Sequence, residues 1–319
     1  MTSTAIAAPE LIRNAAYGMI RRHMNQSRVL VVGATGQLGS VITRKLVQTG
    51  FRVRALARHA EKLAPLAATA EIAAVDLGDV QKLTDACRGV DDVIATANNN
   101  MGSGPTSPTR IDLPAYQNLC AAARNTHVRR LIYVSFRGVG QDVPVDIFRV
   151  KWYIEDAIKR SGLPFVMLRP TAFMEVWIDQ ILAAGIRDKG VATIFGSGDT
   201  ISNYIAVDDV AEFAVKILQT ETVNEAIEVG GPSNVSQNHL ATLVERRLHA
   251  PGKRRHVPAA ALRLLAPVVR PFNEVAARLM TLGLYSASEA TPFPNWQASA
   301  GRFGVAPRSV ETYVDQMAR

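Results

Sequence analysis

The chain has 319 residues, of which 48% are hydrophobic, 20% charged and 6% aromatic. This composition excludes a disordered or fibrous protein, and the length allows a doubly wound α/β domain plus a smaller C-terminal region. The formal net charge of +8 suits phosphate-bearing ligands. Because no DNA-binding motif accompanies it, we expect no nucleic-acid partner.

Only two cysteines occur, Cys87 and Cys120, and the six histidines show no metal-ligand spacing. We therefore expect a cytoplasmic protein with buried thiols and no metal. No apolar run is long enough for a transmembrane segment. Residues 1–27 form an arginine-containing N-terminal extension, for which we favour a short capping helix; a transit-type segment or a partner-binding arm are the alternatives.

The first predicted strand, residues 28–32, runs directly into three spaced glycines and then a helical pattern. Gly33 allows the sharp turn, Gly36 allows close approach of a phosphate, and Gly39 allows the helix to pack tightly on its strand. The helix start adds partial positive charge. The pattern predicts a dinucleotide pyrophosphate site at the turn, contacted also by the intervening residues Thr35, Gln37 and Leu38.

The second predicted strand, residues 51–57, ends in Arg58 rather than in an aspartate or glutamate. A carboxylate at this corner would accept from the ribose hydroxyls of NAD. A guanidinium can instead pair with a 2′-phosphate. The sequence therefore favours NADP, with Lys62 either adding charge or facing water.

After the second strand, predicted strands and helices continue to alternate, which predicts a parallel sheet. Strand 71–75 leads into Asp76 and Leu77, which we place beside the adenine, while Asp79 caps the next helix. Strand 92–97 ends in Ala97 and is followed by Asn98 at the same sheet edge. Residues 98–109 are so rich in turn formers that we expect a mobile loop without regular structure.

A helix over 112–125, a strand over 130–135, a helix over 147–160 and a strand over 164–169 complete the predicted nucleotide-binding domain, residues 28–171. From residue 172 to residue 319 the alternation weakens. We expect a smaller substrate-binding region there, interleaved with the sheet through segments such as 204–207 and 226–230.

Residues 251–285 carry six basic side chains among leucines and a single acidic one, Glu274. Helices that cover a substrate pocket and have a solvated basic face are the favoured interpretation, and a membrane or partner surface is the alternative. Large apolar side chains in the C-terminal region suggest a hydrophobic substrate or an ordinary core: Trp177, Phe195, Leu264, Leu265, Phe272 and Leu284.

Several segments resemble the atypical short-chain dehydrogenase/reductase superfamily, and within it the NmrA-like and isoflavone-reductase-like branch. The similarity covers about residues 28–250 and rests on Gly33-Ala-Thr-Gly36-Gln-Leu-Gly39, Val53-Arg-Ala-Leu-Ala-Arg58, Tyr133-Val-Ser135, Lys151-Trp-Tyr-Ile-Glu155 and Ser161-Gly-Leu-Pro-Phe-Val-Met-Leu-Arg-Pro170. It implies a Rossmann fold, NADP binding and a substrate cleft formed by the C-terminal region.

One departure concerns the proton donor. The superfamily carries a tyrosine four residues before its active-site lysine, on the same helical face, but Ile147 stands there. Tyr153 lies about 200° around the helix from Lys151 and should point away from it.

Lys151 therefore has three interpretations: it holds the nicotinamide ribose, it transfers the proton itself, or it pairs with Glu155 in solvent. Ser135 matches the superfamily's substrate-polarising serine, or merely caps a turn. Arg169, Pro170 and Phe173 are expected on the nicotinamide side.

The leading hypothesis is an NADPH-dependent reductase that transfers a hydride to a C=C, C=N or C=O group of a small, hydrophobic or aromatic substrate. The alternative is a non-catalytic NADP(H)-binding sensor, or a protein that holds the cofactor structurally and acts through a partner. A homodimer is compatible with either function.

Overall fold

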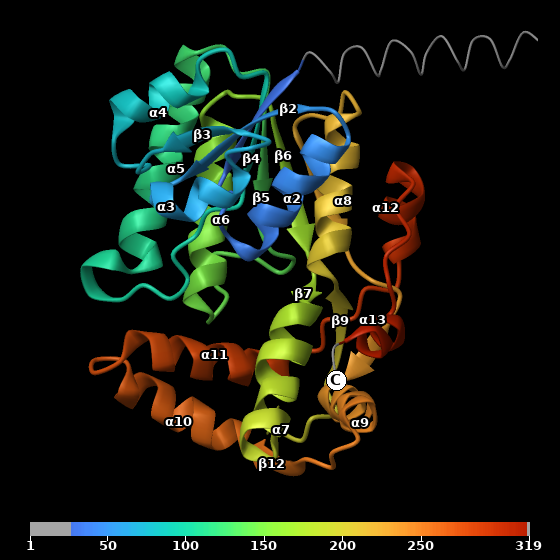
Figure 1. Ribbon diagram of the computed structural model, residues 1–319. Coiled ribbons are helices and arrows are strands. Elements are labelled where there is room, and N and C mark those ends of the chain that lie inside the picture. Colours follow the sequence, from blue (N-terminus) through green and yellow to red (C-terminus); the bar gives the residue numbers. More distant parts are fainter. Residues whose placement is uncertain (1–26, 318–319) are drawn as a thin grey trace, which may run out of the picture.

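The computed structural model describes residues 27–317, and its central feature is a seven-stranded sheet in the order β10-β6-β5-β4-β1-β2-β3 (Figure 1). All six neighbouring pairs are parallel. This arrangement confirms the Rossmann-type α/β class. The seven strands are β1 (Arg28–Val32), β2 (Arg52–Ala57), β3 (Glu71–Ala74), β4 (Asp92–Ala95), β5 (Arg130–Val134), β6 (Phe165–Pro170) and β10 (Glu225–Val229).

Helices cover both faces of this sheet because its strands alternate apolar side chains toward two separate cores. In β5, Ile132 and Val134 join one core, whereas Leu131 and Tyr133 join the other. The first core is covered by α2 (Gln37–Gln48), α3 (Ala60–Leu63), α8 (Val207–Leu218) and α12 (Trp296–Phe303). The second is covered by α4 (Val80–Cys87), α5 (Pro108–Asn125) and α6 (Asp146–Arg160).

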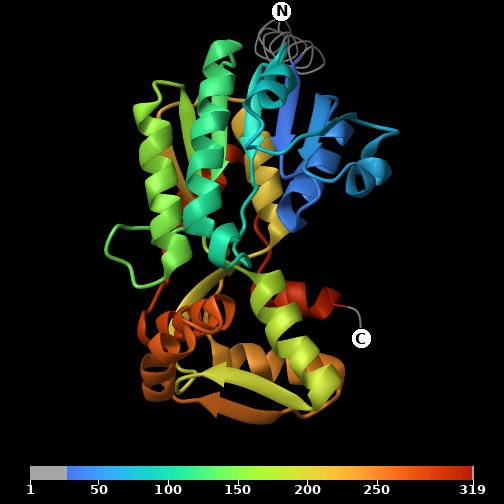
Figure 2. The same cartoon turned by 90° about the vertical axis from the view of Figure 1, so that its left-hand side faces the viewer.

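The remaining C-terminal elements gather beneath the carboxyl ends of the strands, and most of them pack around a third core (Figure 2). Two small sheets run β11-β9-β7 and β12-β8. Their strands are β7 (Ala172–Phe173), β8 (Val191–Phe195), β9 (Ile201–Ile205), β11 (Asn234–Ser236) and β12 (Lys253–Val257). The helices are the π-helix η3 (Glu175–Ala183), α7 (Ala184–Lys189), α9 (Gln237–Leu248), α10 (Ala259–Val269), α11 (Glu274–Ser288) and α13 (Val310–Gln316).

The predicted strands exist, with ends shifted by at most three residues. Asp79 caps α4, as predicted, because its carboxylate accepts from the backbone N–H of Lys82 at 3.1 Å. The prediction of no regular structure over 98–109 is wrong: a 3₁₀ turn spans Gly104–Thr106, and α5 begins at Pro108 instead of residue 112. Proline fits that first helical turn because it has no N–H to leave unpaired.

The predicted capping helix over 1–27 lies outside the described residues except for Ser27. Within residues 27–317, no helix combines the length and the apolar character that crossing a membrane requires. Cys87 and Cys120 are buried, as predicted, and burial raises their thiol pKa values to about 12 and about 11. Both therefore stay protonated and unreactive at neutral pH.

A buried ion pair lies at the amino end of the sheet. Arg130, at the start of β5, donates to Asp92 of β4 at 3.1 Å, and both side chains are almost wholly buried. The guanidinium also donates to backbone carbonyls at the end of α8 and just beyond it, among them those of Ile217 and Thr220. This pair ties two central strands to the helix layer that covers them.

Candidate functional site

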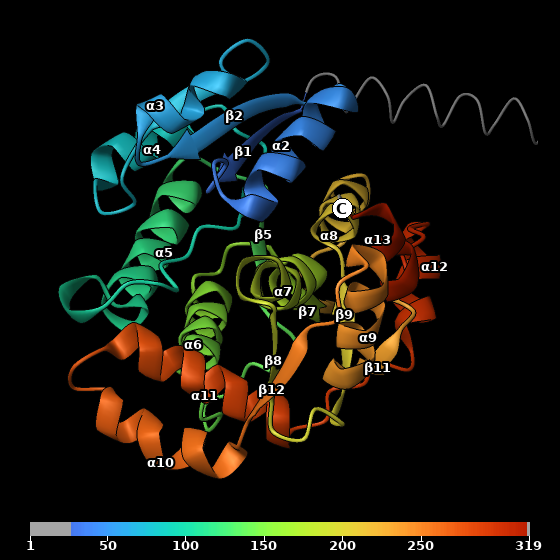
Figure 3. The ribbon, with the colours of Figure 1, turned by 60° about the horizontal axis from the view of Figure 1, so that its bottom comes forward.

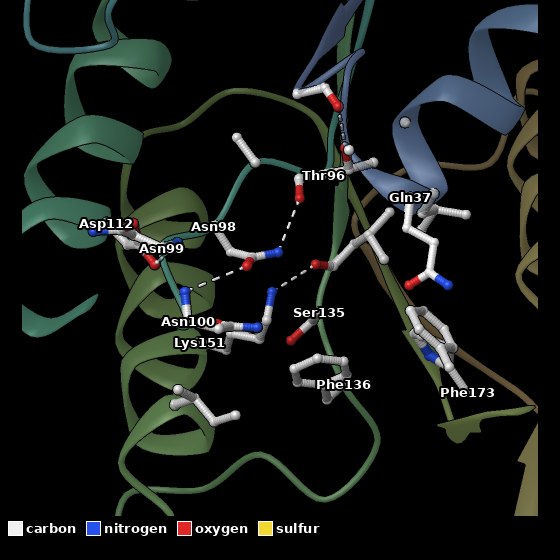
Figure 4. A pocket seen from close by; sticks show the side chains of 18 of the residues that line it. Gln37, Thr96, Asn98, Asn99, Asn100, Asp112, Ser135, Phe136, Lys151 and Phe173 are labelled. Atoms are coloured by element: carbon white, nitrogen blue, oxygen red, sulfur yellow. Dashed lines mark hydrogen bonds between the residues drawn. The ribbon is translucent and has the colours of Figure 1, made fainter. Parts of the chain in front are cut away.

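The main cavity, of about 710 Å³, lies between the carboxyl ends of the strands and the C-terminal elements. Figure 4 shows part of it: the asparagines of the loop after β4 face Gln37 and Phe173, with Ser135, Phe136 and Lys151 between them. The predicted site residues line this cavity, with the exception of Arg169: Gly33, Thr35, Gly36, Gln37, Leu38, Gly39, Arg58, Asp76, Leu77, Ala97, Asn98, Ser135, Lys151, Pro170 and Phe173.

The glycine turn has the geometry that its spacing predicts. Gly33 has φ +89°, and a Cβ there would lie 2.7 Å from the backbone nitrogen of Ala97. At Gly39 a Cβ would lie 2.1 Å from the carbonyl oxygen of Gly33, so only glycine lets α2 pack this closely. No side chain caps α2, and its first backbone N–H groups lack intrahelical acceptors. The cavity end at this turn therefore fits a pyrophosphate.

Positive charge lies near the adenosine end. Arg58 is exposed at the end of β2, and no ion pair holds it within residues 27–317. Arg110, from α5, also lines the cavity and was not predicted, whereas Lys62 does not line it. Asp76 and Leu77 follow β3, and the Leu77 carbonyl accepts from Asn118 at 3.0 Å. The Arg58 guanidinium is therefore free to pair with a further phosphate group at this end of the cavity.

The loop after β4 is held in place by a carboxylate that sequence reasoning missed. Asp112, buried on α5, accepts from the backbone N–H of Asn99 at 3.0 Å. Burial raises the pKa of Asp112, while the Asn99 N–H and the charge of Lys151 oppose that shift. The Ala97 carbonyl accepts from the Tyr116 hydroxyl at 2.7 Å. An aspartate on the apolar face of a predicted helix was the signal that could have revealed this contact.

Lys151 is buried and lies directly under the end of β5. Its Nζ donates to the carbonyl of Val134 at 2.9 Å, lies 3.3 Å from the Tyr133 hydroxyl oxygen, and sits 4.8 Å from the centre of the Phe136 ring. Burial lowers the Lys151 pKa from 10.5 to about 8, although the charges of Asp112 and Glu155 act in the opposite direction. A lysine with this pKa is protonated at neutral pH yet able to release its proton.

The interpretation of Lys151 as a solvated partner of Glu155 is wrong. Lys151 is 4% exposed, and Glu155 instead accepts twice from Arg169, once at 2.9 Å. The prediction for Arg169 is also wrong, because this side chain does not line the cavity. Tyr153 is 40% exposed and lies outside the cavity, as its helical position predicts.

Ser135 directly follows β5 and is fully buried at the cavity wall. Its Oγ has no hydrogen-bond partner among the residues that the structure describes, so the turn-capping interpretation is wrong. An unpaired buried hydroxyl carries a desolvation cost of about 1–3 kcal/mol. A hydroxyl left in that state beside a cavity fits a ligand that completes its hydrogen bonding.

Aromatic rings form a continuous wall on the substrate side. Successive ring centres lie 6.4 Å apart from Phe173 to Phe136, 5.6 Å from Phe136 to Phe148, and 5.4 Å from Phe148 to Tyr285. The last of these belongs to α11, so a helix remote in sequence closes the cavity. Such a wall offers a large apolar surface on which part of a ligand can stack.

The six large apolar side chains that the sequence offers as signs of a hydrophobic substrate lie in several separate places, and only some of them are near the main cavity. Trp177 lines the cavity, and Phe195 packs against it with ring centres 6.1 Å apart. Leu284 lines a second, smaller cavity between α10 and α11. Leu264, Leu265 and Phe272 are exposed on or next to α10 and do not contact the main cavity.

Comparisons with known proteins agree with this geometry. Residues 33–221 match the family model described as NAD(P)H-binding. The chain is 31% identical to a (4-alkanoyl-5-oxo-2,5-dihydrofuran-3-yl)methyl phosphate reductase from Streptomyces griseus, over 85% of this chain and 96% of that protein. It is 29% identical to the photosystem II assembly factor Ycf39 of Cyanophora paradoxa, over 74% of this chain and 73% of that protein.

Among solved structures, the NADPH complex of the Escherichia coli quinone oxidoreductase QOR2 has a similar fold. The TM-score is 0.75 at 19% identity, with 90% of this chain and 98% of that chain covered. The glycine turn, the parallel sheet and the matched family model point to the same class. The chain therefore belongs to the NAD(P)H-binding family and has the Rossmann fold.

Proposed function

We propose that the protein is an NADPH-dependent reductase that acts on a C=C, C=N or C=O group of a small, flat, hydrophobic or aromatic molecule. The observation that carries this proposal is the placement of Lys151 and Ser135. Both lie in one cavity, between the glycine turn and the aromatic wall. A reducible molecule stacked on that wall would lie beside a buried ammonium group and an unpaired hydroxyl.

The cofactor, when bound, supplies the hydride. The N-terminal turn of α2 would hold its pyrophosphate, and Arg58 its 2′-phosphate. Buried walls exclude water and orient the acceptor, which contributes much of the rate in such reactions.

Lys151 is the proposed proton donor. Its lowered pKa suits transfer near neutral pH, and Ile147, one helical turn away, has no hydroxyl for the purpose. The Val134 carbonyl and the Tyr133 hydroxyl hold the ammonium group in position. Ser135 would donate to, or accept from, a polar atom of the acceptor. Holding the nicotinamide ribose is the other role open to Lys151.

The choice of nucleotide tests the role of Arg58. We expect NADPH to bind at least about tenfold tighter than NADH, and Arg58→Ala to remove most of that difference. Isothermal calorimetry on nucleotide-free protein measures both affinities. Lys62→Ala is the matched control, because Lys62 does not line the cavity. Equal affinities in the wild type would contradict the assignment.

Loss of NADPH absorbance with a panel of enones, quinones, imines and azo compounds tests the reductase activity. At least one planar acceptor should be reduced, and Lys151→Met should lower kcat by about 100-fold. Tyr153→Phe, on the opposite side of the same helix, should leave the rate unchanged. Lys151→Met with wild-type kcat and a raised NADPH Kd would assign the lysine to the ribose instead.

A second candidate function is that of a non-catalytic NADP(H)-binding protein that acts through a partner. The similarity to an assembly factor and the isoleucine at position 147 favour it. Tight binding of NADPH together with no oxidation by any acceptor in the panel would support this candidate and reject the reductase.

A further inference from the structure

Helix α10 exposes an unusual set of large apolar side chains. Leu264, Leu265 and Val268 are 70%, 48% and 62% exposed, and Phe272, just beyond the helix end, is 89% exposed. Leu264 and Val268 are one helical turn apart on the same face of α10, and Phe272 follows them in the turn just beyond the helix end. We call these four side chains the α10 patch. Leu262 and Ala266, on the inner side of the same helix, are buried.

The α10 patch lies on the outer surface of the molecule. It lies outside both the main cavity and the smaller cavity between α10 and α11. Figure 3 shows α10 at the outer edge of the molecule, on the far side of α11 from the nucleotide-binding sheet. Neighbouring, highly exposed large apolar side chains of this kind are typical of a surface that binds a protein or a membrane.

Basic side chains border the patch. Arg263 and Arg270 lie on α10 and at its end, and both are exposed. Strand β12, which directly precedes α10, exposes Lys253 and Arg255 at the same end of the molecule (Figures 1 and 3). Glu274 is the single acidic residue between positions 251 and 285. The binding partner of this surface should therefore combine negatively charged groups with an apolar region that the patch can contact.

We propose that the α10 patch and its basic border dock the protein on an anionic lipid surface. An amphipathic helix that projects leucine, valine and phenylalanine from a cationic surround has the properties of an interfacial helix. Arginine and lysine add attraction to acidic headgroups. A second copy of the chain is disfavoured, because docking patch against patch would bring like charges together.

This docking would place one wall of the main cavity close to the lipid. The opposite side of the α10–α11 pair carries Leu282 and Tyr285, which line that cavity. The lipid proposal itself does not depend on the reductase activity, because the exposed side chains and the charges are independent of the cofactor site.

Co-sedimentation with vesicles tests the proposal on the full-length protein. Wild-type protein should bind vesicles of equal parts phosphatidylglycerol and phosphatidylcholine, and bind vesicles of phosphatidylcholine alone much more weakly. Val268→Ser with Phe272→Ser should lower the partition coefficient at least about tenfold. Arg263→Gln with Arg270→Gln should weaken binding and reduce its dependence on salt.

Val80→Ser with Val223→Ser provides the control, because both valines are also exposed, at 48% and 43%, but lie away from α10. NADPH affinity should be unchanged in every variant, which shows that each is folded. If wild-type protein does not bind the acidic vesicles, the lipid assignment is overturned in favour of an acidic protein partner. Sedimentation velocity without lipid gives a further outcome: a dimer that Phe272→Ser abolishes would assign the patch to a second copy and overturn the proposal.

Discussion

The two ends of strand β5 differ in how completely their buried polar groups are hydrogen-bonded. At the amino end, Arg130 is paired with Asp92 and donates to several carbonyls. At the carboxyl end, the Ser135 hydroxyl has no partner among the described residues, and burial depresses the Lys151 pKa. A buried group with its hydrogen bonds formed and a buried hydroxyl without a partner are therefore only a few residues apart along the chain.

This contrast distinguishes structural polar groups from functional ones. A satisfied buried pair contributes to a defined fold, whereas removal of one member leaves an uncompensated charge. Unpaired or desolvated groups cost stability and persist where a ligand completes them. Substitutions at the two ends should therefore change stability in opposite directions.

Arg130→Met should have the largest effect. Loss of the guanidinium leaves Asp92 buried with only Arg129 beside it, which should lower the free energy of unfolding by about 4 kcal/mol. Denaturant titration measures the change. Arg160→Met is the control: Arg160 is 78% exposed in its ion pair with Asp156, so its loss should cost less than about 1 kcal/mol. Equal effects from the two variants would contradict the structural role of Arg130.

Lys151→Met should act in the opposite direction and stabilise the protein near neutral pH. The folded-state pKa of about 8 lies below the ordinary 10.5, so the buried charge costs up to about 3 kcal/mol while both states are protonated. As the pH rises from 8 toward 10.5 the folded protein loses this proton first, and the cost fades.

The stability advantage of Lys151→Met over the wild type should accordingly shrink across that alkaline range. Denaturant titrations of both proteins at a series of pH values measure it. An advantage that does not depend on pH would show that folding leaves the pKa of Lys151 unchanged, and would contradict this prediction.

Ser135→Ala should have the smallest effect on stability and a moderate one on activity. Because Oγ lacks a partner, the unfolding free energy should stay within about 0.5 kcal/mol of wild type or rise. Reductase kcat/KM should fall about tenfold through loss of one hydrogen bond to the acceptor. Ser161→Ala, whose hydroxyl donates to Ile158 at 2.6 Å, should instead lose about 1 kcal/mol of stability and no activity.

The glycine turn, the parallel sheet and the cavity edge could be predicted because each follows from local pattern. Three spaced glycines after a β-branched strand constrain one turn, and parallel strands bring their carboxyl ends to one edge. Residues that follow strands, such as Arg58, Asp76 and Asn98, consequently reach the same cavity without knowledge of tertiary packing.

The prediction for Arg169 is wrong because it neglects the alternation of side chains along β6. Neighbouring residues of a strand point to opposite faces, so Arg169 and Pro170 could not both face the cavity. Pro170 does, and Arg169 turns toward Glu155. Phe148, Tyr285 and the exposed side of α10 could not be predicted, because their positions depend on how α11 packs against segments more than 100 residues away.

Arg278 joins α11, which supplies part of the substrate wall, to the nucleotide-binding domain. This buried side chain of α11 donates to both carboxylate oxygens of Asp146 at 3.0 Å and to the carbonyls of Asn100 and Gly102. Grafting residues 258–290 from a relative would exchange acceptor preference while leaving the nucleotide cradle untouched. The graft would succeed only where an arginine at position 278 and an aspartate at position 146 are kept together.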